Sequence, residues 1–415
     1  MKSTVFQAFE YASYNTKNEG KEGKKLPENL YESLKSFSGE KELPYYSLTA
    51  TGVRFKNYVG ALQIGKWTVE VLPKFDRNMP TSTAQPILIQ MLRQAGILKT
   101  NTPTESNLRI KRNYILETYL QMFLDETKSI IHRGLIKKYH KREDNTYVLK
   151  GSLNFNKHLS MNLIHAERFY VKHTIYDQQH ELNQVLYKTL NVILGLDASF
   201  YLISEIKSLV LNMPELNDIH VSEEFFERIK WSRKNEHYKT AIEIARLLLL
   251  NYHPDLSHGK NNVLALMFDM NDLWEKWFAK RLRLAASDLG LPIGIKEQVK
   301  KTFWIPSNGY SIKQKPDMVI EAANDMRIIL DTKWKIIHNR PSEDDLRQMY
   351  TYNQLFESNR SYLVYPGAGK IISGEFFRNE ENGDCGLAFV PFLEKENLSS
   401  KGINYFISRI LSTNI

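Results

Sequence analysis

Two short apolar segments separated by a turn-forming stretch constrain the fold more than any other feature of this 415-residue chain. The segments span residues 317–321 and 327–331, with Ala-Ala-Asn-Asp after the first, and this pattern predicts a β-hairpin. Asp317 opens the first predicted strand and Asp331 closes the second, so the two carboxylates are expected at the same end of the hairpin. Lys333 stands two residues after Asp331 and is expected on the same face.

Two carboxylates and an ammonium group are what metal-assisted hydrolysis of a phosphodiester requires. Carboxylate oxygens hold Mg²⁺, which usually keeps several waters. The metal polarises a phosphoryl oxygen and acidifies a bound water. Lys333 is expected to orient that water and to offset charge on the phosphate. The backbone carbonyl of Thr332 is a further candidate ligand.

The Asp-x-Lys spacing is not specific by itself. Asp/Glu-x-Lys recurs at four places outside paired apolar strands: Glu19–Lys21, Glu22–Lys24, Glu126–Lys128 and Glu205–Lys207. The alternative interpretation of Asp331 and Lys333 is therefore an exposed ion pair at a strand end.

Helical patterns on both sides of the hairpin carry three more candidates. A helix predicted over about 270–289 carries Glu275, whose carboxylate is placed to hold a metal-bound water. A helix predicted over about 344–356 carries Gln348 and Tyr352, four residues apart and therefore on one face. These two side chains are expected to position the substrate or Lys333. The alternatives are a helix-surface ion pair for Glu275, and capping and core packing for the other two.

In chain order the candidates form a series of motifs: Glu275, Pro316-Asp317, Asp331-x-Lys333 and Gln348-x-x-x-Tyr352. This order resembles the PD-(D/E)xK nuclease superfamily, in the branch that carries a QxxxY motif. The segments 268–273 (FDMNDL), 330–335 (LDTKWK) and 348–352 (QMYTY) resemble the McrC family, the nuclease subunit of McrBC restriction systems. Shorter N-terminal motifs agree: Val59-Gly60, Val71-Leu72-Pro73-Lys74, Lys150-Gly151-Ser152-Leu153 and Glu181-Leu182-Asn183. The resemblance begins near Tyr45, and the polar stretch 15–29 departs from it.

The resemblance implies a Mg²⁺-dependent DNA endonuclease. The metal ligands it implies are Asp317, Asp331, Glu275 and the Thr332 carbonyl. Lys333 would assist the attacking water, with Gln348 and Tyr352 in support. It also implies a partner, the McrB AAA+ GTPase, which recognises modified DNA and translocates. The chain lacks a Gly-x-x-x-x-Gly-Lys-Ser/Thr sequence, so GTP is expected in the partner and not in this chain. Cutting both strands requires a second nuclease domain.

The predicted fold is α+β or α/β in two parts. Residues 1–255 are predicted to dock the partner, with short strands to about residue 80 and mostly helices after it. Residues 256–415 are predicted to form a restriction-endonuclease-like α/β domain, with further strands near 298–305 and 361–365. Within the enzyme class, the alternative is a repair-type QxxxY nuclease that works with a helicase. The non-enzymatic alternative is a DNA-binding assembly subunit.

Composition agrees with these expectations. Lys and Arg total 56 against 47 Asp and Glu, which leaves a formal charge of +9 and suits a polyanion such as DNA. Cys385 is the only cysteine, so an internal disulfide and a cysteine-based zinc cluster are excluded. No run approaches the roughly 18 apolar residues of a membrane span. No apolar signal region follows Met1, and a cytoplasmic protein without membrane contact is expected.

Overall fold

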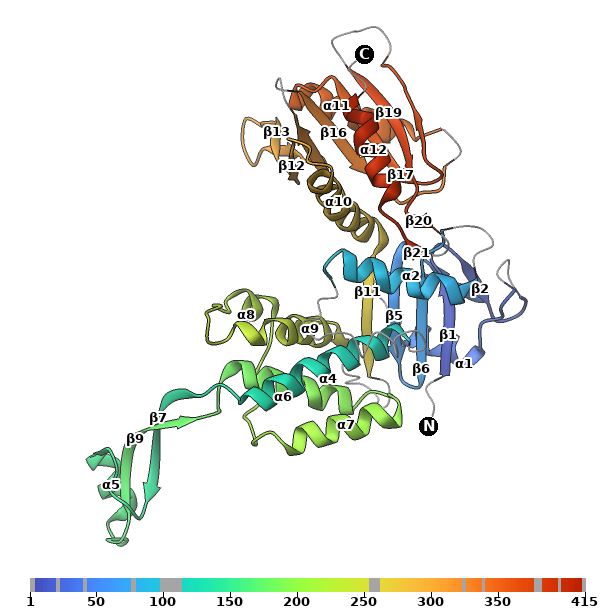
Figure 1. Cartoon of the computed structure of the whole chain (residues 1–415). Coiled ribbons are helices and arrows are strands. Elements are labelled where there is room, and N and C mark those ends of the chain that lie inside the picture. The colour runs from blue at the N-terminus through green and yellow to red at the C-terminus, as the bar shows by residue number, and fades with distance from the viewer. Residues whose placement is uncertain are drawn as a thin grey trace. The chain divides into compact units, whose positions relative to one another are not determined.

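Figure 1 shows the computed structural model of the chain. The structure describes residues 4–19, 23–39, 43–75, 80–97, 114–253, 262–322, 326–337, 340–376, 383–394 and 397–412. Within these ranges, no helix combines the length and the apolar character needed to cross a membrane.

The chain forms two compact units, each built from separate stretches of sequence. Unit 1 comprises Met1–Thr4, Gln63–Thr68 and Thr100–Leu266, and unit 2 comprises Val5–Leu62, Val69–Lys99 and Met267–Ile415. The predicted boundary between residues 255 and 256 falls in the stretch 254–261, outside the described residues. The division of the chain into a docking half and a nuclease half stays a prediction.

Short strands dominate the first 72 residues, which agrees with the prediction. They are β1 (Thr4–Phe9), β2 (Ser13–Asn15), β3 (Tyr46–Thr49), β4 (Gly52–Phe55), β5 (Tyr58–Ile64) and β6 (Trp67–Leu72). With β10 (Tyr252–His253) and β11 (Val263–Asp269) they form a sheet in the order β1-β6-β5-β11-β10 and a sheet in the order β2-β4-β3. The helices α1 (Glu28–Ser38) and α2 (Thr81–Gln94) interrupt or follow the strands.

Unit 1 is mainly helical. Its helices are α4 (Ile115–Arg133), α6 (Glu181–Leu194), α7 (Phe200–Leu211), α8 (Glu223–Glu227), the 3₁₀ turn η2 (Glu236–Tyr238) and α9 (Lys239–Leu250). In α6 the buried residues Leu182, Val185, Leu186 and Leu190 recur every three or four positions. This spacing gives the helix one apolar face, which is buried in the core of the unit.

Unit 1 also carries an exposed three-stranded ribbon. It pairs β7 (Lys138–Thr146), β9 (Phe169–Asp177) and β8 (Ser152–Leu153), and it includes α5 (Phe155–Asn162). Figure 1 shows it extending away from the helices of this unit. Neither β7 nor β9 was predicted. Because much of β7 is exposed, its sequence lacks the alternation of apolar and polar residues that identifies a half-buried strand.

The C-terminal part of unit 2 is a six-stranded mixed sheet with the order β12-β15-β16-β17-β19-β18. Its strands are β12 (Gly294–Glu297), β15 (Met318–Glu321), β16 (Arg327–Thr332), β17 (Arg360–Pro366), β18 (Lys370–Ile372) and β19 (Asp384–Val390). Strand β15 pairs antiparallel with β12 and β16, while β16, β17 and β19 run parallel. Two small hairpins accompany the sheet, β13 (Lys301–Trp304) with β14 (Ile312–Gln314) and β20 (Leu393–Glu394) with β21 (Asn397–Leu398).

Helices cover both faces of this sheet (Figure 1). On one face, α11 (Glu343–Phe356) packs a core that includes Met349, Ile329 and Leu363. On the other face lie α10 (Met270–Asp288) and α12 (Lys401–Ser412): Phe406 contacts Tyr362, and the Trp274 indole donates to the Val364 carbonyl at 3.5 Å. Sheet and helices form the predicted α/β domain.

The predicted hairpin is present as β15 and β16, and the turn residues 323–325 lie outside the described residues. The strand predicted near 298–305 is present as the shorter β13, whereas β12 was not predicted. Gln298, which has a φ of 53°, separates the two strands. A positive φ is uncommon for a residue other than glycine, so the sequence contains no signal for this break.

Candidate active site

The open end of the β15–β16 hairpin brings Asp317 and Asp331 together. The last antiparallel pair joins Met318 to Leu330, so the two aspartates are the next residues along the two strands. Thr332 donates its backbone N–H and its hydroxyl to Oδ2 of Asp317, each at 2.7 Å. Asp331 is buried. The sheet therefore fixes both carboxylates at one point.

Lys333 is held at the same place by groups from two elements. Its Nζ lies 2.7 Å from Oδ2 of Asp331 and donates to Oε1 of Gln348 at 3.0 Å. The Gln348 amide donates to the Tyr352 hydroxyl at 2.7 Å, and that hydroxyl donates to the carbonyl of Lys315 at 3.0 Å. Gln348 and Tyr352 thus form a hydrogen-bonded chain that orients Lys333, beyond the packing role that was the alternative interpretation.

Glu275 reaches the site from α10. It lines a cavity of about 330 Å³ together with Asp317, Asp331, Thr332, Lys333 and Gln348. Its carboxylate accepts a hydrogen bond from Gln298, while the adjacent Lys276 pairs with Asp272. Among the described residues, Glu275 is thus paired with Gln298 and not with a neighbouring lysine of α10.

Asp345 belongs to the site and was not predicted. It is buried on α11, with Oδ1 at 3.5 Å from Nζ of Lys333 and Oδ2 at 3.2 Å from Nζ of Lys335. Asp345 stands three residues before Gln348, so both side chains lie on the same face of α11. This spacing is a sequence signal from which Asp345 could have been predicted. The cavity has four further unpredicted lining residues: Asp269, Asn271, Asp272 and Lys315.

The carboxylates of the site carry more negative charge than their surroundings compensate. Burial and the charge of Asp317 raise the pKa of Asp331 to about 6. Burial also raises the pKa of Asp317, and burial together with Asp317 raises that of Glu275 to about 7. Burial alone would lower the pKa of Lys333, but the neighbouring carboxylates outweigh it and raise that pKa. An excess of buried negative charge favours a bound cation.

The donor set fits Mg²⁺ in particular. Asp317 and Asp331 supply carboxylate oxygens, and the N–H of Thr332 points to Asp317, so its carbonyl faces the same side of the strand. Among the described residues, no group of three or more His, Cys, Asp or Glu side chains is arranged to hold a metal. Mg²⁺ commonly binds through one or two carboxylates and keeps several waters, for which the cavity has room.

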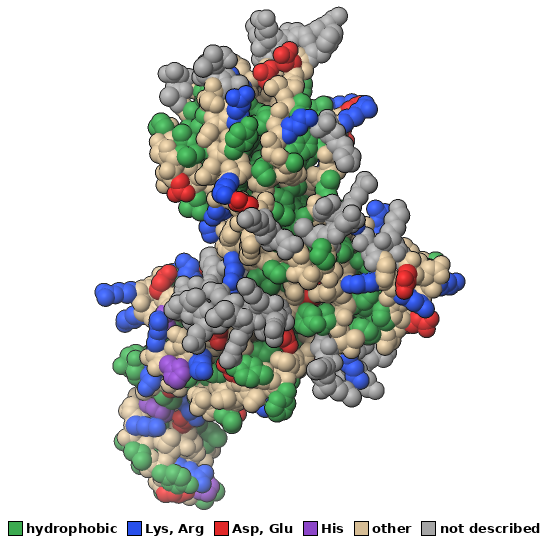
Figure 2. All heavy atoms as spheres, turned by 45° about the vertical axis from the view of Figure 1, so that its right-hand side comes forward, with side chains coloured by type: hydrophobic (Ala, Val, Ile, Leu, Met, Phe, Trp, Pro, Cys, Tyr) green, Lys and Arg blue, Asp and Glu red, His purple; other side chains and the backbone are tan. Residues whose placement is uncertain are grey.

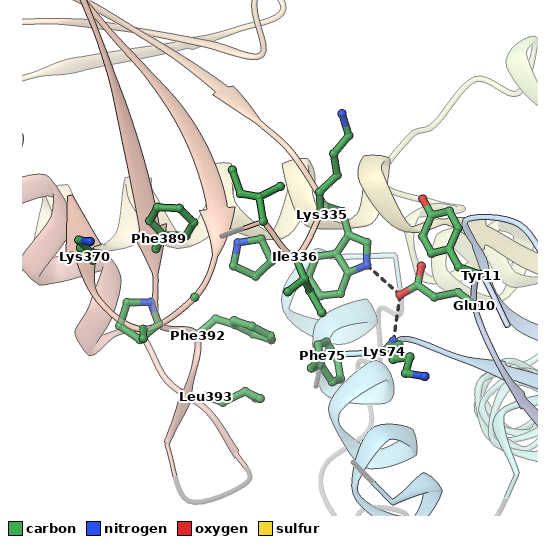
Figure 3. A pocket seen from close by; sticks show the side chains of 16 residues that line it. Glu10, Tyr11, Lys74, Phe75, Lys335, Ile336, Lys370, Phe389, Phe392 and Leu393 are labelled. Atoms are coloured by element: carbon green, nitrogen blue, oxygen red, sulfur yellow. Dashed lines mark hydrogen bonds between the residues drawn. The ribbon is translucent and has the colours of Figure 1, made fainter. Parts of the chain in front are cut away.

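A second cavity of unit 2 has a volume of about 840 Å³, and Figure 3 shows Glu10, Lys74 and Phe392 among its lining residues. Trp334, the residue after Lys333, also lines it. The Trp334 indole donates to Oε1 of Glu10 at 2.8 Å, and the backbone N–H of Lys74 donates to the same oxygen at 3.0 Å. Glu10 is 1% exposed, and burial raises its pKa to about 7. The segment that carries Lys333 is thus tied to the residue that follows β1.

Fold and site together define an α+β protein in which a mixed sheet of unit 2 brings two aspartates and a lysine together in one cavity. The family model described as McrBC 5-methylcytosine restriction system component matches residues 53–366, which is more than half of the chain. The chain belongs to this family, and the predicted family resemblance is confirmed.

One solved structure supports the fold assignment. The chain is similar to one from a half-complex of a tetradecameric assembly of Thermococcus gammatolerans McrB AAA+ hexamers with bound McrC. The TM-score is 0.68 and the identity 19%, over 98% of this chain and 100% of that chain. A second match, at a TM-score of 0.48 and 19% identity, comes from the cryo-EM structure of the McrBC complex of the same organism and covers 68% of this chain and 88% of that chain. No curated protein matches the chain.

Proposed function

We propose that the chain is the Mg²⁺-dependent endonuclease subunit of a modification-dependent restriction system and cleaves DNA when activated by an AAA+ GTPase. The observation that carries the proposal is the convergence of Asp317, Asp331 and Lys333 in one cavity of a member of the McrBC family. The buried carboxylate of Asp331 and the half-buried carboxylate of Asp317, beside a fixed ammonium group, match the requirements of metal-assisted phosphodiester hydrolysis.

Each residue has a distinct role in this proposal. Asp317, Asp331 and the Thr332 carbonyl hold Mg²⁺, and Glu275 contributes through a metal-bound water or as a further ligand. The bound metal supplies Lewis-acid activation of the phosphoryl oxygen and lowers the pKa of a water. Lys333 remains protonated because its pKa is raised, so it donates hydrogen bonds and offsets charge on the phosphate.

The support for Lys333 comes from α11. Gln348 accepts a hydrogen bond from its ammonium group, and Tyr352 fixes the amide of Gln348 in turn. Asp345 adds a second carboxylate near the same nitrogen. The ammonium group is therefore oriented before substrate arrives, which lowers the cost of reorganisation during the reaction.

We propose an McrB-like AAA+ GTPase as the partner, because the similar solved structure is an assembly of McrB AAA+ hexamers with bound McrC. The ribbon of β7, β8, β9 and α5 is a candidate contact surface. Its exposed apolar side chains include Tyr139, Tyr147, Phe155, Leu163 and Ile164. Figure 2 shows apolar side chains among basic ones at its lower left, over this ribbon. Such exposed apolar surface is typical of protein interaction sites.

The test is cleavage of a modified plasmid by the full chain with its AAA+ partner, Mg²⁺ and GTP. We expect a double-strand break that requires all four components, with two nuclease domains meeting to cut both strands. A non-hydrolysable GTP analogue should allow assembly without cleavage. Asp331→Ala should bind the partner and fail to cut.

Three results would contradict the proposal. Wild-type-like cleavage by Asp331→Ala would contradict the proposed role of Asp331 as a metal ligand. Dependence on ATP with progressive degradation from DNA ends would favour the repair-type nuclease. Absence of Mg²⁺-dependent cleavage, with DNA binding retained, would favour the assembly subunit.

A further inference from the structure

The hairpin of β13 and β14 leads directly into the candidate active site. We call residues 300–315 the basic ribbon. Strand β14 ends at Gln314, the next residue Lys315 lines the 330 Å³ cavity, and Asp317 follows two positions later. The charge of Lys315 acts on Asp317 and lowers its pKa, against the larger effect of burial. A substrate in the cavity would therefore lie beside this ribbon.

All charged side chains of the basic ribbon are positive. Residues 298–316 contain four lysines and no aspartate or glutamate, in a chain where acidic and basic residues are otherwise nearly balanced. Lys300, Lys313 and Lys315 are exposed. Lys313 and Lys315 are two positions apart, so in an extended strand they share a face. This face leads from the ribbon to the cavity.

The ribbon also exposes large apolar side chains. Five of them are more than half exposed: Phe303, Trp304, Ile305, Tyr310 and Ile312. Trp304 pairs across the strands with Ile312, and Tyr310, in the connecting loop, is 98% exposed. A register irregularity between Thr302 and Trp304 changes the course of β13 near these residues.

The base of the ribbon is fixed to the domain. Lys301 donates to the carbonyl of Leu355 at 3.0 Å and lies 5.1 Å from the ring centroid of Phe356, both on α11. The fourth lysine is therefore structural, while the other three are on the surface. The ribbon is thus anchored at the helix that also carries Gln348 and Tyr352.

Lysines interleaved with exposed aromatic residues favour DNA over a protein partner. Protein interfaces are depleted in lysine, whereas DNA binding depends on lysine and arginine contacts to phosphates. A two-stranded ribbon fits the major groove of DNA. Exposed aromatic and apolar side chains stack on bases or wedge between base steps.

We propose that the basic ribbon is a DNA-binding element that holds the duplex next to the scissile phosphate. Lys300, Lys313 and Lys315 contact phosphates, and Trp304 and Tyr310 contact bases. This inference rests on the proposed function, because the DNA that the basic ribbon would bind is the substrate of the proposed nuclease.

The test compares ribbon variants of the full chain for binding to a fluorescent duplex and for cleavage by the assembled system. The variants are Lys313→Ala and Trp304→Ala/Tyr310→Ala. The matched controls are Lys401→Ala and Tyr405→Ala, two exposed residues of α12. We expect each ribbon variant to bind the duplex about tenfold more weakly and to cleave correspondingly more slowly, with the controls unchanged. Lys313→Ala should also reduce the slope of log K against log salt by about 0.9.

Stimulation of the partner GTPase is measured in parallel and should be unchanged, which shows that the variants fold and assemble. Wild-type-like DNA binding and cleavage by the ribbon variants would overturn the inference. Loss of GTPase stimulation with unchanged DNA binding would also overturn it and assign the ribbon to the partner. A third outcome separates the two proposals. If the wild type does not cleave DNA but the ribbon variants bind DNA more weakly than the wild type, the nuclease proposal is wrong and the DNA-binding role of the basic ribbon is supported.

Discussion

The two ends of the β15–β16 hairpin each carry an ion pair with the same separation. At the turn end, Nζ of Lys296 lies 2.7 Å from Oε2 of Glu321. At the open end, Nζ of Lys333 lies 2.7 Å from Oδ2 of Asp331. The lysine and acid side chains are 57% and 40% exposed at the turn end, but 19% and 4% exposed at the open end. The pairs differ in burial and not in distance.

Burial decides what each pair can do. An exposed ion pair is screened by water and contributes little to stability. At the open end, burial and the charge of Asp317 raise the pKa of Asp331 to about 6 although a lysine lies beside it. One ammonium group therefore does not balance the carboxylates, which supports the proposed cation site. An Asp-x-Lys motif is therefore informative about function only where its carboxylate is desolvated.

The largest expected difference between the two ends is in cleavage. Asp317→Asn removes a ligand charge from the proposed metal site and should reduce the cleavage rate at least about 10³-fold, since loss of a single electrostatic donor already costs ~10²–10³. Glu321→Gln should remain within about twofold of the wild type. The measurement is single-turnover cleavage by the assembled system, and equal losses in both variants would remove the distinction.

The two lysines should differ next. Lys333→Met is expected to reduce cleavage ~10²–10³-fold and to leave Mg²⁺ binding intact, because Asp317 and Asp331 remain. Lys296→Met is the matched control and should leave both properties unchanged. Titration calorimetry with Mg²⁺ separates the two effects. Loss of metal binding in Lys333→Met would give this lysine a structural role instead.

The open end of the hairpin is predictable from sequence because continuous apolar runs determine where both strands lie. Asp317, Asp331 and Lys333 follow from those strand ends, and Gln348 and Tyr352 follow from helical spacing. The turn-end pair was not predicted, because Lys296 lies on β12, a strand of only four residues that the sequence analysis did not identify.

Three other features were not predicted. The positive φ of Gln298 separates β12 from β13 and places this side chain against Glu275. Asp345 lies outside the predicted motifs and was recognised from its distance to Lys333, although its spacing of three residues from Gln348 was an available signal. The exposed ribbon of β7 and β9 was missed because little of β7 is buried, so no apolar alternation marks it. The predictions were correct for segments in which burial produces a regular pattern of apolar residues.

Glu10 lies outside the candidate active site and provides a separate test of how burial changes the pKa of a carboxyl group. Its pKa is about 7 in the folded chain against an ordinary value of 4.5, because of burial. As the pH rises, the Glu10 carboxyl group loses its proton in the unfolded chain before it does so in the folded chain. The free energy of unfolding therefore falls as the pH rises from about 4.5 to 7. Glu10→Gln removes that cost of up to ~3 kcal/mol and keeps an acceptor for Trp334 and Lys74.

Urea unfolding measures this effect. Glu10→Gln should stabilise the chain more at pH 8 than at pH 5 relative to the wild type, and the advantage should disappear by pH 4. Glu32→Gln, at an exposed position of α1, is the control and should show no such pH dependence. A stability difference that is the same at every pH would show that ionisation of Glu10 is not disfavoured in the fold.

The smallest expected effect is the coupling between Lys296 and Glu321. A double-mutant cycle with Lys296→Met and Glu321→Gln should give a coupling free energy below ~1 kcal/mol, because both side chains are exposed. The coupling should vanish in 1 M salt, where the screening length is about 3 Å. A coupling above ~2 kcal/mol, or one that persists in high salt, would mean that this pair is protected from solvent. Burial would then not explain why only the open end of the hairpin carries the candidate active site.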